Sequence, residues 1–171
     1  QILINEGRKF SKVDLSFPNA GWWNVLYLRD LDGDQDLDLV LGNLGNNSRF
    51  DATSEHPLKL FYSDFDQNGF PECIMTFSAE NGKDYPYALR HNLTLQLRYL
   101  KKKYPDFASF KDADMTQIFD ENQLRETSVQ QVNELNSVWI ENLGNNQFKK
   151  HILPLAVQFS PVYAIAAADI D

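Results

Sequence analysis

The stretch Asp30-Leu-Asp32-Gly-Asp34-Gln-Asp36-Leu-Asp38 decides how the rest of the chain is interpreted, because it places a carboxylate on every second residue. Without a cation these side chains would repel one another, and a flexible loop of acidic oxygens is what a hard cation such as calcium selects. A second version follows at Asp64-Phe-Asp66-Gln-Asn68-Gly69-Phe70-Pro-Glu72, and a third begins at Asp169-Ile-Asp171. The sequence therefore predicts metal-binding loops held by the elements around them.

Length, composition and charge limit the class of protein. A chain of 171 residues is long enough for one domain with a real core. The net charge of -8, with no basic block, argues against a nucleic-acid partner. The single cysteine, Cys73, excludes an internal disulfide, and no apolar run approaches the ~18 residues of a transmembrane segment. No signal peptide is visible, and a start at Gln1 suggests a processed or trimmed piece of a longer protein.

An Asn/Gly turn that ends in phenylalanine recurs three times. Its copies are Asn5-Glu-Gly7-Arg-Lys-Phe10, Asn43-Leu-Gly45-Asn-Asn-Ser-Arg-Phe50 and Asn142-Leu-Gly144-Asn-Asn-Gln-Phe148. Such turns are typical of β-hairpins. The segments before the acidic loops (24–29, 58–63 and 162–168) and those after them (37–41 and 73–77) read as strands. The near-continuous apolar run at 162–168 favours a strand that is buried on both faces.

Residues from about 88 to 126 interrupt this rhythm and predict a helical insertion within the middle repeat. Leucines at 93, 95, 97 and 100, followed by three lysines, indicate one helix that ends before Tyr104-Pro105. Apolar residues between Phe107 and Phe119 indicate a second short helix. Strands are expected to resume around 128–132 and 137–140.

The spacing of the oxygen-bearing residues defines the ligands. Numbered from its first aspartate, each loop offers side-chain oxygens at positions 1, 3, 5 and 9 and a backbone carbonyl at position 7. An EF-hand is excluded because position 12 is Leu41 in one loop and Met75 in the other, and because the flanks read as strands. The predicted calcium ligands are Asp30, Asp32, Asp34, Asp36 and Asp38 in the first loop, and Asp64, Asp66, Asn68, Phe70 and Glu72 in the second.

The pattern Asp-x-Asp-Gly-Asp-x-Asp-Leu-Asp-Leu, preceded by a strand and followed by Gly-Asn, resembles the FG-GAP or VCBS repeat of integrin α chains and bacterial exported proteins. The Asn-x-Gly-Asn-Asn-x-Phe turns are similar to those of the bacterial group related to cartilage acidic protein. The resemblance covers all of the chain but the insertion. It implies a mainly β fold: residues 1–171 would be a single partial β-propeller of about three repeats, whose acidic loops bind calcium.

Three features depart from the family pattern. Position 6 of the first loop is Gln35 where the family usually has glycine, and a non-glycine residue in the left-handed region costs about 1 kcal/mol. This loop is therefore expected to bind more weakly or to turn differently. The third loop stops at Asp171 and cannot close a site, and the family's propellers have more repeats than this chain.

Two classes of function follow from the resemblance. The first is a calcium-binding, non-enzymatic module that is secreted, periplasmic or on the cell surface and serves as a binding or adhesion scaffold for a protein or glycan partner. The second is a part of a glycan-acting enzyme, since polysaccharide lyases include similar propellers. An enzyme should show a cleft that contains groups of shifted pKa, and no such constellation stands out in the sequence. The first class is therefore favoured.

Overall fold

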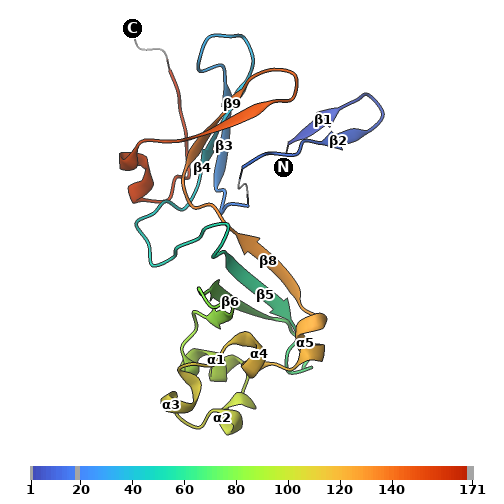
Figure 1. Cartoon of the computed structure of the whole chain (residues 1–171), viewed down its shortest axis with the longest axis vertical. Helices are drawn as coiled ribbons and strands as arrows, with labels where there is room; N and C mark the ends of the chain where they lie inside the picture. Colours follow the sequence, from blue (N-terminus) through green and yellow to red (C-terminus); the bar gives the residue numbers. More distant parts are fainter. Residues whose placement is uncertain (1, 18–19, 169–171) are drawn as a thin grey trace. The chain divides into compact units, whose positions relative to one another are not determined.

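Antiparallel strands dominate the computed structural model, which describes residues 2–17 and 20–168 (Figure 1). Within these residues ten strands form three antiparallel sheets, so the chain is mainly β. These sheets do not close into a propeller within the described part of the chain. The third acidic stretch, Asp169 to Asp171, lies outside the described residues.

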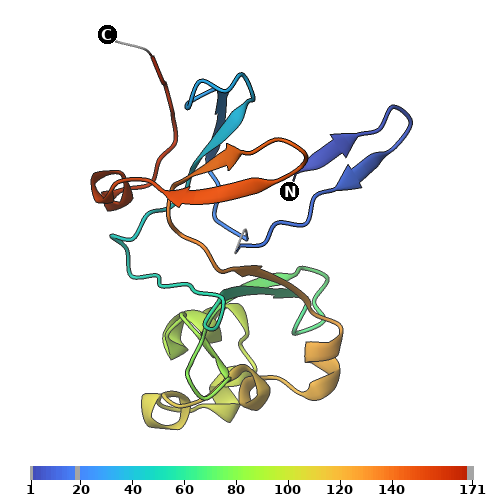
Figure 2. The ribbon, with the colours of Figure 1, turned by 45° about the horizontal axis from the view of Figure 1, so that its top comes forward.

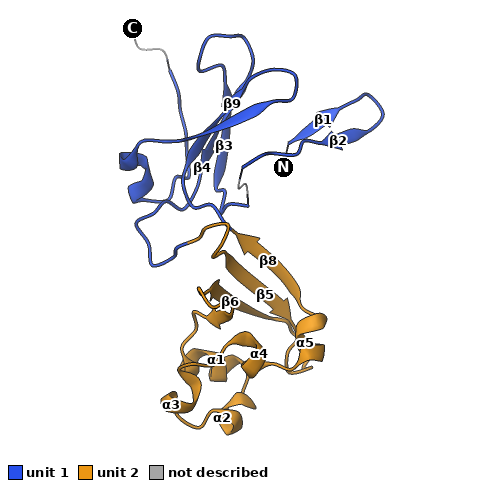
Figure 3. Cartoon of the chain, viewed as in Figure 1, with its two compact units in different colours: residues 1–51, 133–171 blue, residues 52–132 orange. Residues whose placement is uncertain are grey.

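The chain divides into two compact units, one made of residues 1–51 and 133–171 and the other of residues 52–132 (Figure 3). Each unit contains a four-stranded sheet, its own apolar cluster and one of the two acidic loops.

The sheet of the first unit has the strand order β10-β9-β4-β3, with every neighbouring pair antiparallel. The first acidic loop joins β3 to β4. One face of the sheet contributes Leu41, Val138 and Ile140 to a small core against Phe17 and Trp23. The elements of this unit are β1 (Leu3–Asn5), β2 (Phe10–Lys12), β3 (Val25–Arg29), β4 (Asp38–Gly42), β9 (Val138–Asn142), β10 (Phe148–Ile152) and the 3-10 helix η1 (Leu155–Phe159).

The sheet of the second unit has the order β7-β6-β5-β8 and is also antiparallel. The second acidic loop joins β5 to β6. The strands are β5 (Leu58–Ser63), β6 (Glu72–Ser78), β7 (Asp84–Pro86) and β8 (Ser128–Val132). Their most buried residues lie on the two central strands, where Leu58, Phe61 and Ile74 are at most 8% exposed.

Five short helices lie between β7 and β8 and cover one side of this sheet (Figure 2). They are α1 (Arg90–Gln96), α2 (Leu100–Lys103), α3 (Phe107–Phe110), α4 (Met115–Ile118) and α5 (Glu121–Arg125). The sequence predicted one helix and a second short helix in this insertion, so the predicted number of helices is wrong. Asp106, Asp114 and Asp120 begin α3, α4 and α5 through capping boxes, and this local chemistry divides the later part of the insertion into short helices. The break between α1 and α2 has no such side-chain cap.

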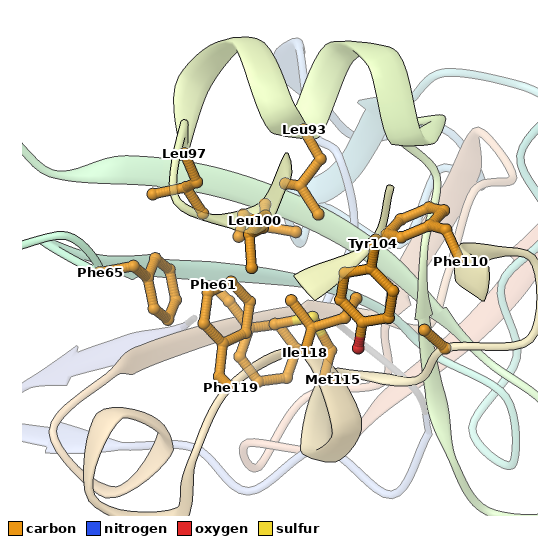
Figure 4. Packing of buried hydrophobic residues seen from close by; sticks show 12 residues of the cluster. Phe61, Phe65, Leu93, Leu97, Leu100, Tyr104, Phe110, Met115, Ile118 and Phe119 are labelled. Atoms are coloured by element: carbon orange, nitrogen blue, oxygen red, sulfur yellow. The ribbon is translucent and has the colours of Figure 1, made fainter. Parts of the chain in front are cut away.

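The helices supply most of the core of the second unit. Leu93, Leu97 and Leu100 point from α1 and α2 toward the aromatic side chains of the sheet and of the later helices (Figure 4). Phe65, from the second acidic loop, lies in the same cluster and is 3% exposed. The insertion is thus part of the fold of this unit rather than an appendage.

The Asn43 turn does not form the predicted hairpin. β4 ends at Gly42, and the next strand, β5, belongs to the other unit. The fully buried Asn43 amide accepts from the backbone of Trp22 and Leu44. It also donates to the carbonyl oxygens of Glu134 and Asn136. These contacts direct the chain out of the sheet. The other two copies of the turn do form hairpins, β1–β2 and β9–β10.

The segment 162–168 was expected to be a buried strand, and this prediction is wrong. It has no strand assignment, and Tyr163 is 71% exposed. Its backbone makes isolated hydrogen bonds and no strand ladder. The Val162 N–H donates to the Asn43 carbonyl, and the Ala167 carbonyl accepts from the Arg29 side chain. An apolar run forms a strand only where a neighbouring strand completes its hydrogen bonds.

Candidate metal sites

The two acidic loops occupy equivalent places in their sheets, each at the end of a pair of neighbouring antiparallel strands. Asp38 lies opposite Arg29 in the first pair, and Glu72 lies opposite Ser63 in the second. This register brings position 9 beside position 1 at the base of each loop. Residues that are eight positions apart in sequence therefore face one another across a closed turn.

The loops share three hydrogen bonds from backbone N–H groups to side chains. The first aspartate accepts from position 6: Gln35 donates to Asp30 at 3.0 Å, and Gly69 donates to Asp64 at 2.8 Å. Position 5 accepts from position 7, both times at 2.8 Å. Position 9 accepts from position 2, both times at 3.0 Å. The second loop therefore repeats the conformation of the first.

Backbone angles confirm the turn at position 6, where Gly69 has φ +90° and Gln35 has φ +76°. Gln35 therefore adopts the same left-handed turn as Gly69. The expectation that the first loop could turn differently is wrong. Position 4 is also left-handed, with Gly33 at +85° and Gln67 at +57°. Each loop holds one glycine and one glutamine in this region, but at exchanged positions.

Each loop gathers three carboxylates. Asp30, Asp32 and Asp38 form one cluster, and Asp64, Asp66 and Glu72 form the other; in each, one oxygen per residue lies within 4.8 Å of the others. Two ligands on opposite sides of a calcium ion are separated by about 5 Å, since each bond is about 2.3–2.6 Å long. Both clusters are therefore compact enough to hold one metal ion.

One carboxylate oxygen of the second cluster lacks a partner. The Oδ1 atom of Asp66 is buried and accepts no hydrogen bond. A buried, unsatisfied carboxylate oxygen is costly unless a cation or a donor compensates it. The donor set, made only of oxygens, fits a hard cation.

The electrostatics of both clusters disfavour the metal-free, fully ionised state. The Asp34 N–H lowers the pKa of Asp32, but burial and the charges of three neighbouring aspartates outweigh it, so the pKa is raised. Burial raises the pKa of Glu72, the Phe65 N–H opposes this, and the charges of Asp66 and Asp64 raise it further. A bound cation would relieve this repulsion.

Four predicted ligands lie outside the two carboxylate clusters. Asp34 Oδ1 and Asn68 Oδ1 each accept the backbone N–H of position 7, namely that of Asp36 and that of Phe70. These bonds shape the loop. Metal ligation by these four residues, like that by the six in the clusters, stays a prediction.

The sequence did not indicate what each loop contacts. Asp38 is fully buried, and its Oδ1 accepts from the backbone of Asn142 at 2.9 Å, which ties the first loop to the β9–β10 turn. In the second loop, Gln123 of α5 donates through Nε2 to the carbonyl of Phe65 at 2.8 Å. The spacing Asp120-x-x-Gln123 could have revealed the capping box that places Gln123, but nothing local predicts its bond to the loop.

Comparison of the chain with family models, curated proteins and solved structures gives no match. The resemblance to FG-GAP repeats thus stays a prediction that rests on the motif residues. In the described part of the chain, the helices are too short to cross a membrane.

Proposed function

We propose that the chain is a calcium-binding β module that acts as a scaffold for a protein or glycan partner outside the cytoplasm. The observation that carries the proposal is the repetition of one loop conformation, with three matching hydrogen bonds and a three-carboxylate cluster, in two separate sheets. The three carboxylates gathered in each loop support a shared role for the two loops in metal binding.

Calcium is the proposed ion because of the type and number of ligands. Calcium takes six to eight oxygen ligands in flexible geometry, whereas magnesium requires near-ideal octahedral geometry and gives up water reluctantly. A loop that combines three carboxylates with side-chain and backbone oxygens at positions 5 and 7 suits the larger ion. The proposed ligands are those predicted from the sequence in both loops.

The proposed architecture is a part of a β-propeller. Two four-stranded antiparallel sheets, each with an acidic loop between neighbouring strands, are compatible with two blades. The family resemblance supports an extracellular adhesion or binding role, and a fold alone does not fix function. A role within a glycan-acting enzyme is the alternative, which turnover of a glycan panel would reveal.

The experiment is thermal unfolding with calcium and then with excess chelator, on the wild type and on Asp32→Ala and Asp66→Ala. An ion that binds only the folded state stabilises it by about 2.7 kcal/mol at 100 times its dissociation constant. We expect calcium to raise Tm and each variant to lose part of the shift. An unchanged Tm in chelator, together with no protein-bound calcium by mass spectrometry, would overturn the proposal.

A further inference from the structure

Phe65 belongs to the second acidic loop through one hydrogen bond and connects that loop to the helical core by two further contacts. Its backbone N–H donates to Glu72 at 3.0 Å, within the proposed calcium site. Its carbonyl accepts from Gln123 of α5. Its ring is buried and stacks on Phe119 with the centroids 4.1 Å apart (Figure 4). A displacement of the loop backbone at Phe65 would therefore disturb α5 and the packing of the core together.

The first loop lacks this connection. Leu31 holds the same position and donates the same backbone bond to Asp38, but its side chain is 41% exposed. The first loop is instead joined to the β9–β10 turn, where the Asn142 N–H meets Asp38 and the Asn142 amide donates to Leu37 at 3.4 Å. The two loops share a conformation but contact different elements of the protein.

We propose that calcium at the second loop stabilises the helical insertion through Phe65 and Gln123, whereas calcium at the first loop stabilises only the β9–β10 hairpin. This inference rests on the proposed function. Because binding and stability are reciprocally linked, a contact that transmits the effect of calcium to the helices must also contribute to calcium affinity. The helical insertion thereby becomes the calcium-dependent part of its unit.

Hydrogen exchange read by mass spectrometry tests the assignment of each loop to its element. Asp32→Ala leaves only the second loop able to bind, and Asp66→Ala leaves only the first. Some backbone amides exchange only when the acidic loop unfolds with them. With calcium at 100 times its dissociation constant, the exchange of these amides should slow by up to about 100-fold. We expect this gain in residues 90–125 of Asp32→Ala and in residues 142–148 of Asp66→Ala, and not the reverse.

The contact between Gln123 and the Phe65 carbonyl can be tested with Gln117 as the control. Gln117 and Gln123 both complete capping boxes by accepting the N–H of the capping aspartate, at 3.1 and 3.0 Å. Of the two, Gln123 is the one whose Nε2 donates to the acidic loop. In the Asp32→Ala background, Gln123→Ala should weaken calcium binding about fivefold, the effect of one hydrogen bond, while Gln117→Ala should leave it unchanged.

The outcomes separate the inference from the proposed function. Helix protection in Asp32→Ala with a selective effect of Gln123→Ala supports the inference. Calcium binding with protection confined to residues 64–72, or an equal loss in Gln117→Ala, overturns it and leaves the calcium sites intact. No binding in titration calorimetry would overturn both. Asp66→Asn, which conserves shape, replaces Asp66→Ala if circular dichroism in chelator shows that the alanine variant is unfolded.

Discussion

Replacement of Gln35 or Gln67 by glycine is expected to stabilise the protein, because both residues hold left-handed backbone angles of +76° and +57°. An L-residue in this region costs about 1–2 kcal/mol. Glycine avoids that cost but loses more conformational freedom on folding, by about 0.5–1 kcal/mol. The net gain in the free energy of unfolding is therefore about 0–1.5 kcal/mol for each substitution. The backbone N–H of Gln35 that binds Asp30 is retained in the variant.

The reverse substitutions, Gly33→Ala and Gly69→Ala, should destabilise the protein by about 1 kcal/mol each. An added Cβ meets no atom within 4 Å at either glycine, so the expected cost comes from the backbone angle and not from a clash. Gly82, at φ +74°, has the same open surroundings outside the acidic loops. Gly82→Ala is thus a matched control for stability that should leave calcium affinity unchanged.

Urea denaturation in chelator and in saturating calcium measures these differences, and Tm should move by about 2–4 °C for each kcal/mol in a chain of this size. A loss of stability in both glutamine-to-glycine variants would contradict the assigned backbone angles. Neutral alanine variants at Gly33 and Gly69 would contradict them equally.

Three further predictions concern the first unit. Burial raises the pKa of Glu134, but hydrogen bonds from Lys150 and Asn136 outweigh it and hold the pKa below its usual value near 4.5. The stability that Glu134 contributes is present above that value and lost as pH falls through the lower, folded pKa, so Glu134→Gln should show a shallower loss of stability in acid titrations. Lys150→Met, which leaves the buried Glu134 carboxylate uncompensated, should cost about 3 kcal/mol at neutral pH in urea denaturation. Asn43→Leu should destabilise by about 3 kcal/mol because it leaves buried backbone groups unpaired, and an effect below 1 kcal/mol would contradict the assigned bonds.

The strands that flank the acidic loops were predictable because their signals are local. Alternating apolar residues define β5 as Leu58–Ser63, and the acidic spacing places the loop directly after it. The number of helices was not predictable from apolar spacing alone. Asp114, which lies within the expected second helix, could have indicated that a new helix begins there.

Failures of sequence interpretation occurred where distant residues decide the conformation. The same turn motif forms a hairpin at Asn142 but not at Asn43. The Asn43 amide instead donates to the carbonyls of Glu134 and Asn136, which are 91 and 93 positions away in sequence. The segment 162–168 has the composition of a strand but no recorded neighbouring strand in the described part of the chain. Propensity describes what a segment can form, and partners determine what it does form.

Glycine position does not explain why the two loops share one conformation. The first loop has glycine at position 4 and glutamine at position 6, and the second has the opposite order, yet both positions are left-handed in both loops. What the loops have in common is the set of backbone N–H groups accepted by side chains at positions 1, 5 and 9. The hydrogen bonds to the carboxylates at positions 1 and 9 are stronger than neutral ones and can outweigh about 1 kcal/mol of backbone strain. The same oxygens that would hold the cation therefore also shape the loop, so a motif search should weight the acidic spacing above the glycine.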